Sequence, residues 1–348
     1  MTTAEKKDNN NNANANNTKK KSNDELAPVY ESTPVDVAWN TRDVLLFANS
    51  IGCEKEQLWY LYENHPHFTP FPTYPIVLTF KHTHTSTIPF AQHFDTFLNP
   101  AIPDYPHFDS TRVVDGGRTL HVHHPIPSTS PSTATFTITS RILSITDKGP
   151  KKPAIVVIEH RLESAGTLYA TVTETTIYLG QGGFGGPTGA PRLPPIPVVP
   201  PMGRDAGGVD AVLEHRIPET AHLLYRLNGD YNPLHADPAA GVNAGFKGEI
   251  MHGLYTWNSV ARAVLRRFGG DGEEGLGVGE LVIFEARFVA PTRPGDALRT
   301  ECWVTKDGRE REVVFRTWVK EGGVGEEKLC LNGGRAVIKV NGKVKGKL

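Results

Sequence analysis

The sequence predicts an α+β protein built from two halves, each of which ends in a cluster of antiparallel strands. β-Branched runs bounded by turn residues gather at 132–179 and again at 281–342, a pattern typical of such strands. Between the clusters, residues 180–208 contain nine Gly and seven Pro, which disfavours both helices and strand ladders. We therefore predict an interdomain linker at 180–208.

Length and composition exclude several classes of protein. The chain has 348 residues, 37 Lys plus Arg against 38 Asp plus Glu, and 3 Cys. At roughly 150 residues per domain, this length fits about two domains. A net charge of −1 gives no general reason to bind nucleic acid or an anionic membrane, which require clustered positive charge. The separated cysteines suit neither a disulfide framework nor a CxxC metal site.

The ends of the chain offer little to bury. Residues 9–17 hold seven Asn in nine positions and three lysines follow shortly, so we expect residues 1–27 to be a disordered tail. No run approaches the roughly 18 apolar residues needed to span a bilayer, and no apolar core of a signal peptide is present. We expect a reduced, intracellular protein with domains at 28–179 and 209–348.

The first half is predicted to start with helices and to finish with strands. Asn40 and Thr41 can cap a helix that stops at Gly52, and a second short helix is expected at 54–63. Turn signals then separate three strands. These strands fall within 132–147, 153–164 and 166–179.

The second half is predicted to hold one long helix followed by four strands. Its apolar residues share one helical stripe that ends at Gly269; they are Leu254, Trp257, Ala261, Val264, Leu265 and Phe268. Arg262, Arg266 and Arg267 fall on the opposite side, where we expect a solvated face, although any of them could meet phosphate groups. A helix followed by antiparallel strands suggests a sheet wrapped around the helix.

The densest polar constellation lies at 225–237. Asp230, Asn232 and His235 fall within six positions around Pro233, and Asn-Pro initiates a turn that folds the histidine back toward the aspartate. A carboxylate and an imidazole in one pocket could hold a water between them. The alternative is a loop in which the Asp and Asn side chains only stabilise turns.

A second group of histidines invites a metal site. His121 and His123 would share one face of a strand, with His124, His82 and His84 elsewhere. No Cys, Asp or Glu completes a tetrahedral set near them. We predict surface or pocket histidines and no metal.

The polar constellation and the residues after it resemble a known family. Gly229-Asp230-Tyr231-Asn232-Pro233-Leu234-His235, then Gly245-Phe246, then Ile250-Met251-His252-Gly253-Leu254, are similar to the hydratase 2 signature of MaoC-like R-specific enoyl-CoA hydratases. Residues 41–52 and 61–75 resemble the start of the eukaryotic two-domain hydratase 2 proteins. The resemblance implies a double hotdog, with two antiparallel sheets each wrapping a long helix and catalysis in the second half.

The resemblance also assigns roles within the signature. Asp230 and His235 take the places of the catalytic pair, and Asn232 that of an orienting amide. Gly253 takes the place of the donor whose N–H stabilises the enolate oxygen, which suits the first turn of a helix. The sequence leaves open which of the pair is acid and which is base, because coupled groups titrate together.

Four further residues are expected to bind the acyl-CoA substrate, and no other cofactor is implied. These residues are Tyr225, Gly229, Phe246 and His252. The sequence departs from the family at Gly248-Glu249, where relatives usually have a proline, and at Asp115-Gly116-Gly117-Arg118, where two-domain relatives often have His-Gly-Glu. We expect the first half to be catalytically silent and to help form the acyl pocket.

We therefore predict an R-specific 2-enoyl-CoA hydratase of fatty acid β-oxidation. The alternatives are a dehydratase of a specialised polyketide or toxin thioester, a non-catalytic acyl-CoA-binding protein, and a thioesterase of the same fold. The ending Gly346-Lys347-Leu348 resembles the Ser-Lys-Leu peroxisomal address; without import the protein would be cytoplasmic. The family likeness also suggests a homodimer.

Overall fold

The computed structural model describes residues 28–90, 102–109, 112–189, 208–269 and 279–340. The predicted tail at 1–27 and the terminal tripeptide lie outside the described residues. Among those described, no helix is both long and apolar enough to cross a membrane.

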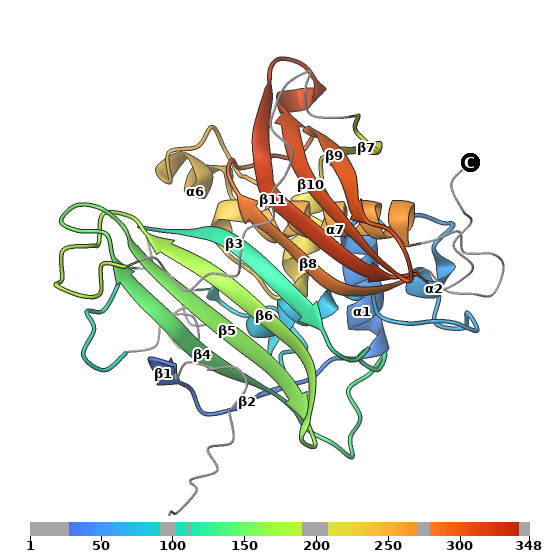
Figure 1. Ribbon diagram of the computed structural model, residues 1–348, viewed down its shortest axis with the longest axis horizontal. Helices are drawn as coiled ribbons and strands as arrows, with labels where there is room; N and C mark the ends of the chain where they lie inside the picture. The colour runs from blue at the N-terminus through green and yellow to red at the C-terminus, as the bar shows by residue number, and fades with distance from the viewer. Residues whose placement is uncertain (1–27, 91–101, 110–111, 190–207, 270–278, 341–348) are drawn as a thin grey trace, which may run out of the picture.

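The described strands form a single eleven-stranded antiparallel sheet (Figure 1). Its order is β1-β4-β5-β6-β3-β8-β11-β10-β9-β7, and β2 also pairs with β4. The strands are β1 (Tyr30–Glu31), β2 (Val35–Val37), β3 (Val113–Val122), β4 (Phe136–Asp147), β5 (Ala154–Ser164), β6 (Thr167–Tyr178), β7 (Ala211–Arg216), β8 (Glu280–Phe288), β9 (Ala297–Lys306), β10 (Glu310–Lys320) and β11 (Glu327–Lys339).

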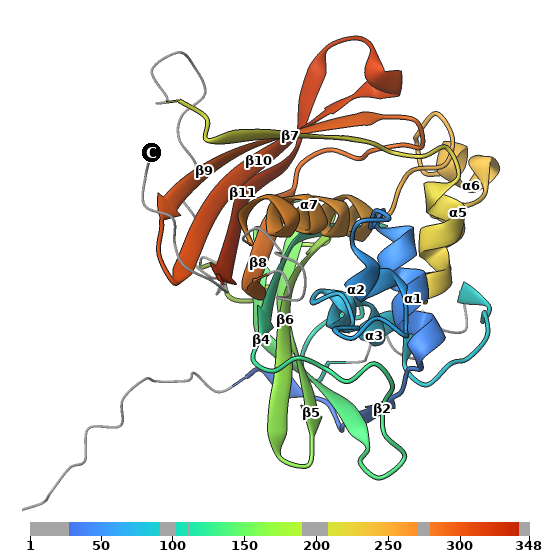
Figure 2. The same ribbon diagram turned by 90° about the vertical axis from the view of Figure 1, so that its right-hand side faces the viewer.

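The helices lie on one side of this sheet, and the C-terminal strands curve around the longest of them, α7 (Figure 2). The helical elements are α1 (Thr41–Ser50), α2 (Leu58–Leu61), η1 (Tyr74–Val77), α3 (Leu78–Lys81), α5 (Ala221–Tyr225), η4 (Arg226–Asn228), η5 (Pro233–His235), α6 (Pro238–Asn243), α7 (Gly253–Phe268) and η6 (Glu321–Gly323). The predicted α+β double hotdog is confirmed, with its two sheets fused into one.

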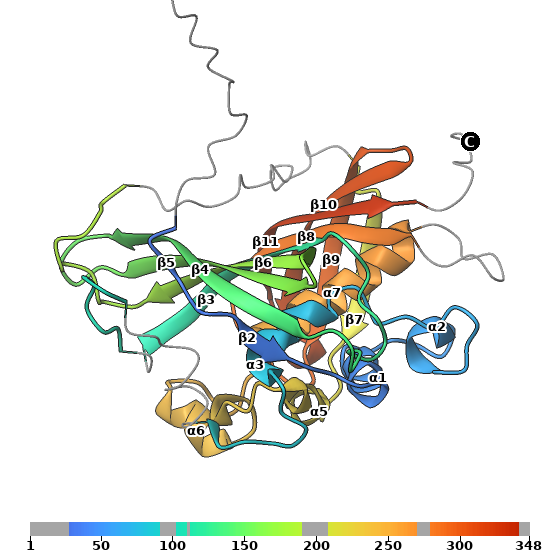
Figure 3. The same ribbon diagram turned by 90° about the horizontal axis from the view of Figure 1, so that it is seen from below.

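The two halves join where β3 pairs with β8. Leu120 of β3 lies opposite Phe284 of β8, and both side chains are fully buried. On the helical side, α1 packs against α5 (Figure 3), and Asn228 Nδ2 donates to Ser50 Oγ over 2.9 Å. One apolar core therefore runs through both halves.

The predicted helices are present with adjusted lengths. Asn40 caps α1 through a capping box with Asp43, which satisfies N–H groups of the first turn. The helix expected at 54–63 is shorter, because Gln57 Oε1 accepts the Glu54 N–H over 3.1 Å and closes a turn ahead of α2. In the described part of the first half, the longest helix is α1 with 10 residues, against 16 in α7.

The predicted solvated arginine face is wrong for Arg262. That side chain is only 4% exposed, and its Nη1 pairs with Glu54 Oε1 over 3.2 Å. Arg266 contacts the same carboxylate. Both cations are thus used to hold the start of the first half against α7.

The described beginning of the predicted linker folds back onto the first half. Asp147 accepts backbone N–H groups from Gly183, Gly185 and Gly186, and its own N–H donates to Pro187 O over 2.7 Å. These bonds place residues 183–187 against the end of β4. The rest of the linker, 190–207, lies outside the described residues.

Gly229 packs the second half onto the first, which predicts a specific sensitivity. Its φ is 124°, and an added Cβ would lie 2.7 Å from the Lys81 backbone N. We expect Gly229→Ala to lower the free energy of unfolding by about 2–4 kcal/mol, from backbone strain plus overpacking, measured by denaturant titration.

The matched control is Gly149→Ala. Gly149 has φ 100° and no atom within 4 Å of an added Cβ, so its substitution introduces strain without a clash. Equal losses in the two variants would contradict tight packing of Gly229 on Lys81.

Candidate active site

The signature residues 229–235 form a turn held by their own side chains. Asp230 Oδ1 accepts the Asn232 N–H over 3.2 Å, and Asn232 Oδ1 accepts the Leu234 N–H over 3.0 Å. The second bond caps η5, which ends at His235. The Asp and Asn side chains therefore do stabilise the turn, as the alternative interpretation of this loop expected, and the same hydrogen bonds bring His235 toward Asp230.

A second segment, the extended stretch before α7, clamps this turn. The Ile250 N–H donates to Leu234 O over 3.3 Å, and His235 Nδ1 lies 3.0 Å from Ile250 O. Because a carbonyl oxygen can only accept, His235 Nδ1 must carry the proton. The lone pair of a neutral His235 is therefore on Nε2.

His252 lies directly against His235. Their rings stack with centroids 3.7 Å apart, and His252 Nε2 donates to the backbone O of Asp230 over 3.0 Å. Its Nε2 is also 4.0 Å from the Asp230 carboxylate. Ligand atoms of Asp230, His235 and His252 all lie within 4.8 Å of one another, so the sequence-predicted pair meets a third group.

Burial keeps both imidazoles neutral. Burial lowers the pKa of His235, and the nearby Asp230 charge and the Ile250 hydrogen bond only partly oppose this. Burial and the neighbouring His235 lower the pKa of His252 to about 3. Two stacked rings in one apolar site cannot both be charged. At neutral pH, His235 therefore offers a basic Nε2 beside the carboxylate of Asp230.

Gly253 supplies a free donor next to this group. It is the exposed first residue of α7, after the N-cap His252, so its N–H has no partner within the helix. An added Cβ would lie 3.2 Å from the ring of Phe288, which leaves no easy room for a side chain. The geometry suits an anionic oxygen at this helix end.

The four residues predicted to bind substrate lie in different surroundings. Tyr225 and His252 are each only 2% exposed; Tyr225 accepts a hydrogen bond from Asn258 over 3.1 Å and packs 5.1 Å from the His252 ring. Gly229 is buried against Lys81. Phe246 is half-buried, and its N–H donates to Gly241 O over 3.0 Å.

Sequence reasoning missed the main-chain groups that hold the site. Ile250 O fixes the tautomer of His235, and Thr292 O receives the Met251 N–H over 2.8 Å. Both acceptors are backbone oxygens, which the identity of the residue does not reveal. At the departure from the family, Gly248 has φ 151°, which proline cannot adopt, so a proline at this position would require a different backbone conformation.

The histidines at 121–124 and the residues whose spacing would suit a metal ion are two different groups in the structure. His121, His123 and His124 are exposed, and His123 Nε2 lies 3.0 Å from Thr171 Oγ1. The group whose spacing would suit a metal is instead Asp230, His235 and His252. Two imidazole nitrogens there are already bound to carbonyl oxygens, and the absence of a metal stays a prediction.

A helix wrapped by an antiparallel sheet, with Asp and His before it and a free N–H at its start, defines a double-hotdog protein with a hydratase-type site. The second half matches the model of the MaoC like domain over residues 204–325. The first half matches the MFE-2 hydratase 2 N-terminal domain over 38–180. The chain belongs to the MaoC-like dehydratase and hydratase 2 family.

Relatives of known name agree with this assignment. The chain is 40% identical to the "Probable dehydratase NIT22" of Ajellomyces capsulatus, covering 90% of this chain and 81% of that protein. It is 32% identical to the "3-hydroxyacyl-thioester dehydratase Y" of Mycobacterium tuberculosis, covering 86% and 93%. Among solved structures, a MaoC-like dehydratase from Phytophthora capsici aligns with a TM-score of 0.74 at 26% identity, covering 90% and 96%.

The lowered pKa of His252 predicts a pH-dependent stability. Between pH 6.5 and about pH 3, His252 is protonated in the unfolded state and neutral in the folded state. The free energy of unfolding therefore decreases as the pH is lowered through this window. We expect a loss of about 1 kcal/mol from this group between about pH 6.5 and 5.5, measured by denaturant titration.

His252→Asn should flatten this dependence, leaving the share that His235 contributes. His67→Asn, a change at an exposed histidine, serves as the control and should leave the slope unchanged. An unchanged slope in His252→Asn would mean that His252 titrates normally in the folded protein.

Proposed function

We propose that this protein is an R-specific enoyl-CoA hydratase that interconverts trans-2-enoyl-CoA and (3R)-3-hydroxyacyl-CoA. The observation that carries the proposal is the convergence of the Asp230 carboxylate, the basic Nε2 of His235 and the free N–H of Gly253. Membership of a family of thioester hydro-lyases supports the same chemistry.

The proposed hydration uses one water, held between Asp230 and His235. Its oxygen forms the bond to C3 of the enoyl group while a proton passes to His235 Nε2. The electron pair of the double bond moves onto the thioester oxygen, where the Gly253 N–H stabilises the enolate. Collapse of the enolate takes at C2 the proton that His235 received, returned through the Asp230–His235 pair, which restores both the thioester carbonyl and the neutral imidazole.

The hydrogen bonds favour His235 as the base in this direction. Ile250 O holds its Nδ1 proton, as the partner of a catalytic imidazole does in other acid–base sites. Asp230 is partly exposed and is oriented by the Asn232 N–H, which suits it to bind the water. Asn232 acts through the turn that it caps, and so positions the pair.

A second candidate is a dehydratase that acts on a specialised thioester. A polar row crosses the inner face of the first-half sheet, made of Ser140, His160, Glu174, Arg118 and Asp115. Ser140 Oγ contacts His160 Nδ1 over 2.8 Å, Arg118 binds Glu174, and Arg118 Nε binds Asp115 over 2.7 Å.

This polar row separates two apolar clusters of the same sheet. An unbranched alkyl chain laid across it would place apolar surface against charged groups and gain no hydrogen bond from them. A thioester with a polar substituent could hydrogen-bond to the same groups. The 40% identity to a "Probable dehydratase" points the same way.

We further propose a peroxisomal location and a homodimer. The C-terminal tripeptide Gly346-Lys347-Leu348 supports the location, and so does similarity to the Neurospora crassa "Peroxisomal hydratase-dehydrogenase-epimerase", 31% identical over 91% of this chain and 32% of that protein. A fluorescent fusion with and without Leu348 would test the address, and light scattering would test the dimer.

Removal of either catalytic group should abolish hydration. Asp230→Asn loses the charge that binds the water, and His235→Ala loses the base, so each should lower kcat by about 10²–10⁴-fold. Loss of enoyl absorbance measures the rate, and chiral analysis of the product should give the 3R isomer for the wild-type protein.

Two variants serve as matched controls. Asp237→Asn changes another acid near the turn, one that only caps α6, and His67→Ala changes an exposed histidine; both should remain active. A 3S product, or retained activity in either catalytic variant, would refute the mechanism. Release of free thiol would indicate a thioesterase, and binding without turnover a non-catalytic protein.

A substrate panel separates the two candidate functions. Trans-2-decenoyl-CoA and an analogue with a terminal hydroxyl group differ only in polarity at the acyl end. If the polar row contacts that end, kcat/KM should be about tenfold higher for the hydroxylated analogue, the value of one well-placed hydrogen bond. Equal values would leave the simple hydratase as the better description.

A further inference from the structure

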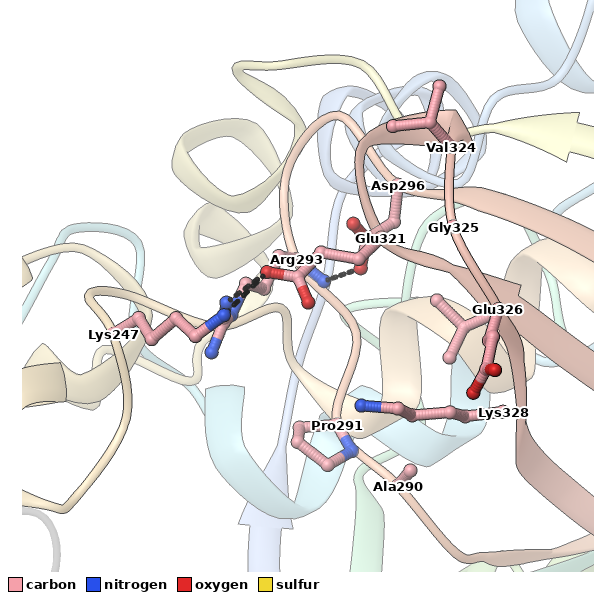
Figure 4. A pocket seen from close by; sticks show the side chains of 11 residues that line it. Lys247, Ala290, Pro291, Arg293, Asp296, Glu321, Val324, Gly325, Glu326 and Lys328 are labelled. Carbon is pink, nitrogen blue, oxygen red and sulfur yellow. Dashed lines mark hydrogen bonds and ion pairs between the residues drawn. The ribbon is translucent and has the colours of Figure 1, made fainter.

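A cavity of about 580 Å³ lies in the second half, near the start of α7. It is bounded by Lys247, by the turn between β8 and β9 and by the far end of the β10–β11 hairpin (Figure 4). Thr292, within the first of these turns, binds both the Met251 N–H and the hydroxyl of Thr256. The cavity is therefore adjacent to the catalytic segment.

The β8 strand connects this cavity directly to the oxyanion donor. The ring of Phe288 faces Gly253, and Ala290 and Pro291, two and three residues later, line the cavity. If the carbonyl oxygen of a thioester is bound at Gly253, the carrier group attached to its sulfur atom would lie close to this cavity.

Two cations, Lys247 and Arg293, converge on one carboxylate in the cavity, and Lys328, Asp296 and Glu326 also line it. Lys247 Nζ lies 3.2 Å from Glu321 Oε1, and Arg293 Nη1 lies 3.1 Å from the same oxygen. Figure 4 shows both side chains reaching Glu321, with Lys328 on the cavity wall. The hydrogen bond from Lys247 lowers the pKa of Glu321, and the charges of Lys247, Arg293 and, to a smaller extent, Lys328 lower it further.

The carboxylate at this point is weakly held. Glu321 is 57% exposed at its side chain, and ion pairs in such positions contribute little. It begins a short turn, η6, in which Gly322 and Gly323 have φ of 57° and 76°. A phosphate carries more charge and three acceptor oxygens, so it binds the same cations more strongly than a carboxylate does.

We propose that this cavity binds the phosphate groups of coenzyme A, with Lys247, Arg293 and Lys328 as ligands, and that Glu321 occupies their place until substrate arrives. This inference rests on the proposed function for the identity of the arm. It assigns the phosphate contacts to loops of the second half and not to the arginines of α7, two of which bind Glu54.

The test compares thioesters with and without phosphate groups. The same trans-2-enoyl group is offered on coenzyme A and on pantetheine, to Lys247→Ala, Arg293→Gln and Lys328→Ala. Each variant should raise KM for the coenzyme A thioester about five- to tenfold, with kcat and the pantetheine reaction unchanged. Lys306→Ala is the control, because Lys306 is an exposed lysine paired with Glu310 at the opposite end of these strands.

Glu321→Gln gives the sharper result. Loss of the competing charge should lower KM for the coenzyme A thioester about threefold, whereas a merely structural role for Glu321 would raise KM for both thioesters. Unchanged KM values for coenzyme A in all four cavity variants would overturn the inference, while turnover of the pantetheine thioester would show that the proposed function stands.

Binding of free coenzyme A, followed by calorimetry, tests the cavity without any turnover. Lys247→Ala and Lys328→Ala should weaken binding about five- to tenfold, and pantetheine should bind too weakly to show a difference. Equal binding by wild-type and variant proteins would overturn the inference even if no enoyl thioester is hydrated.

Discussion

The burial of α7 is the constraint on which the rest of the structure depends. The four C-terminal strands curve around this helix, and Trp257 and Val264 are fully buried against them. Polar residues of the same helix are buried too, and one of them is held locally: Asn258 Nδ2 donates to Leu254 O and to the Tyr225 hydroxyl. Because the helix cannot turn or slide, its first N–H groups are fixed at one edge of the core, where Gly253 is exposed.

The electrostatics of the site follow from that placement. His252 precedes the buried helix and is itself buried, so its imidazole stays neutral and can stack on His235. The stack and the Ile250 carbonyl together fix the orientation and the tautomer of His235. Nε2 of His235 is thus kept basic with a carbonyl oxygen, and not a carboxylate, as the partner of Nδ1. The Asp230 carboxylate therefore stays available to bind the water.

Helices and strands whose apolar residues are regularly spaced could be predicted from the sequence, and those in which this spacing is interrupted could not. The stripe of α7 and the β-branched runs of β4, β5 and β6 mark these elements clearly. β3 was missed because Gly116-Gly117 sits at a register shift between Asp115 and Gly117 that interrupts the alternation. The burial of Arg262 was equally hidden, since its partner Glu54 lies more than 200 residues away in sequence.

The candidate pair Asp230 and His235 was predictable because both side chains belong to one short turn. Their supports were not, because the groups that orient them are backbone carbonyls from other segments, at Ile250 and beyond it at Thr292. A backbone group has the same identity at every position, so only the fold can reveal it.

The position of the site suggests how a substrate lies across the molecule. The cavity with Lys247, Arg293 and Lys328 in its wall belongs to the second half, whereas the polar row with Arg118 belongs to the first. Arg118 of β3 pairs with Ala286 of β8, two residues before Phe288, whose ring faces Gly253. If the carrier arm lies in the cavity as proposed and the acyl group points toward the first half, a substrate would span both halves. The two halves would then divide recognition between them, and substitutions in the half without the catalytic residues would be the ones that change acyl preference.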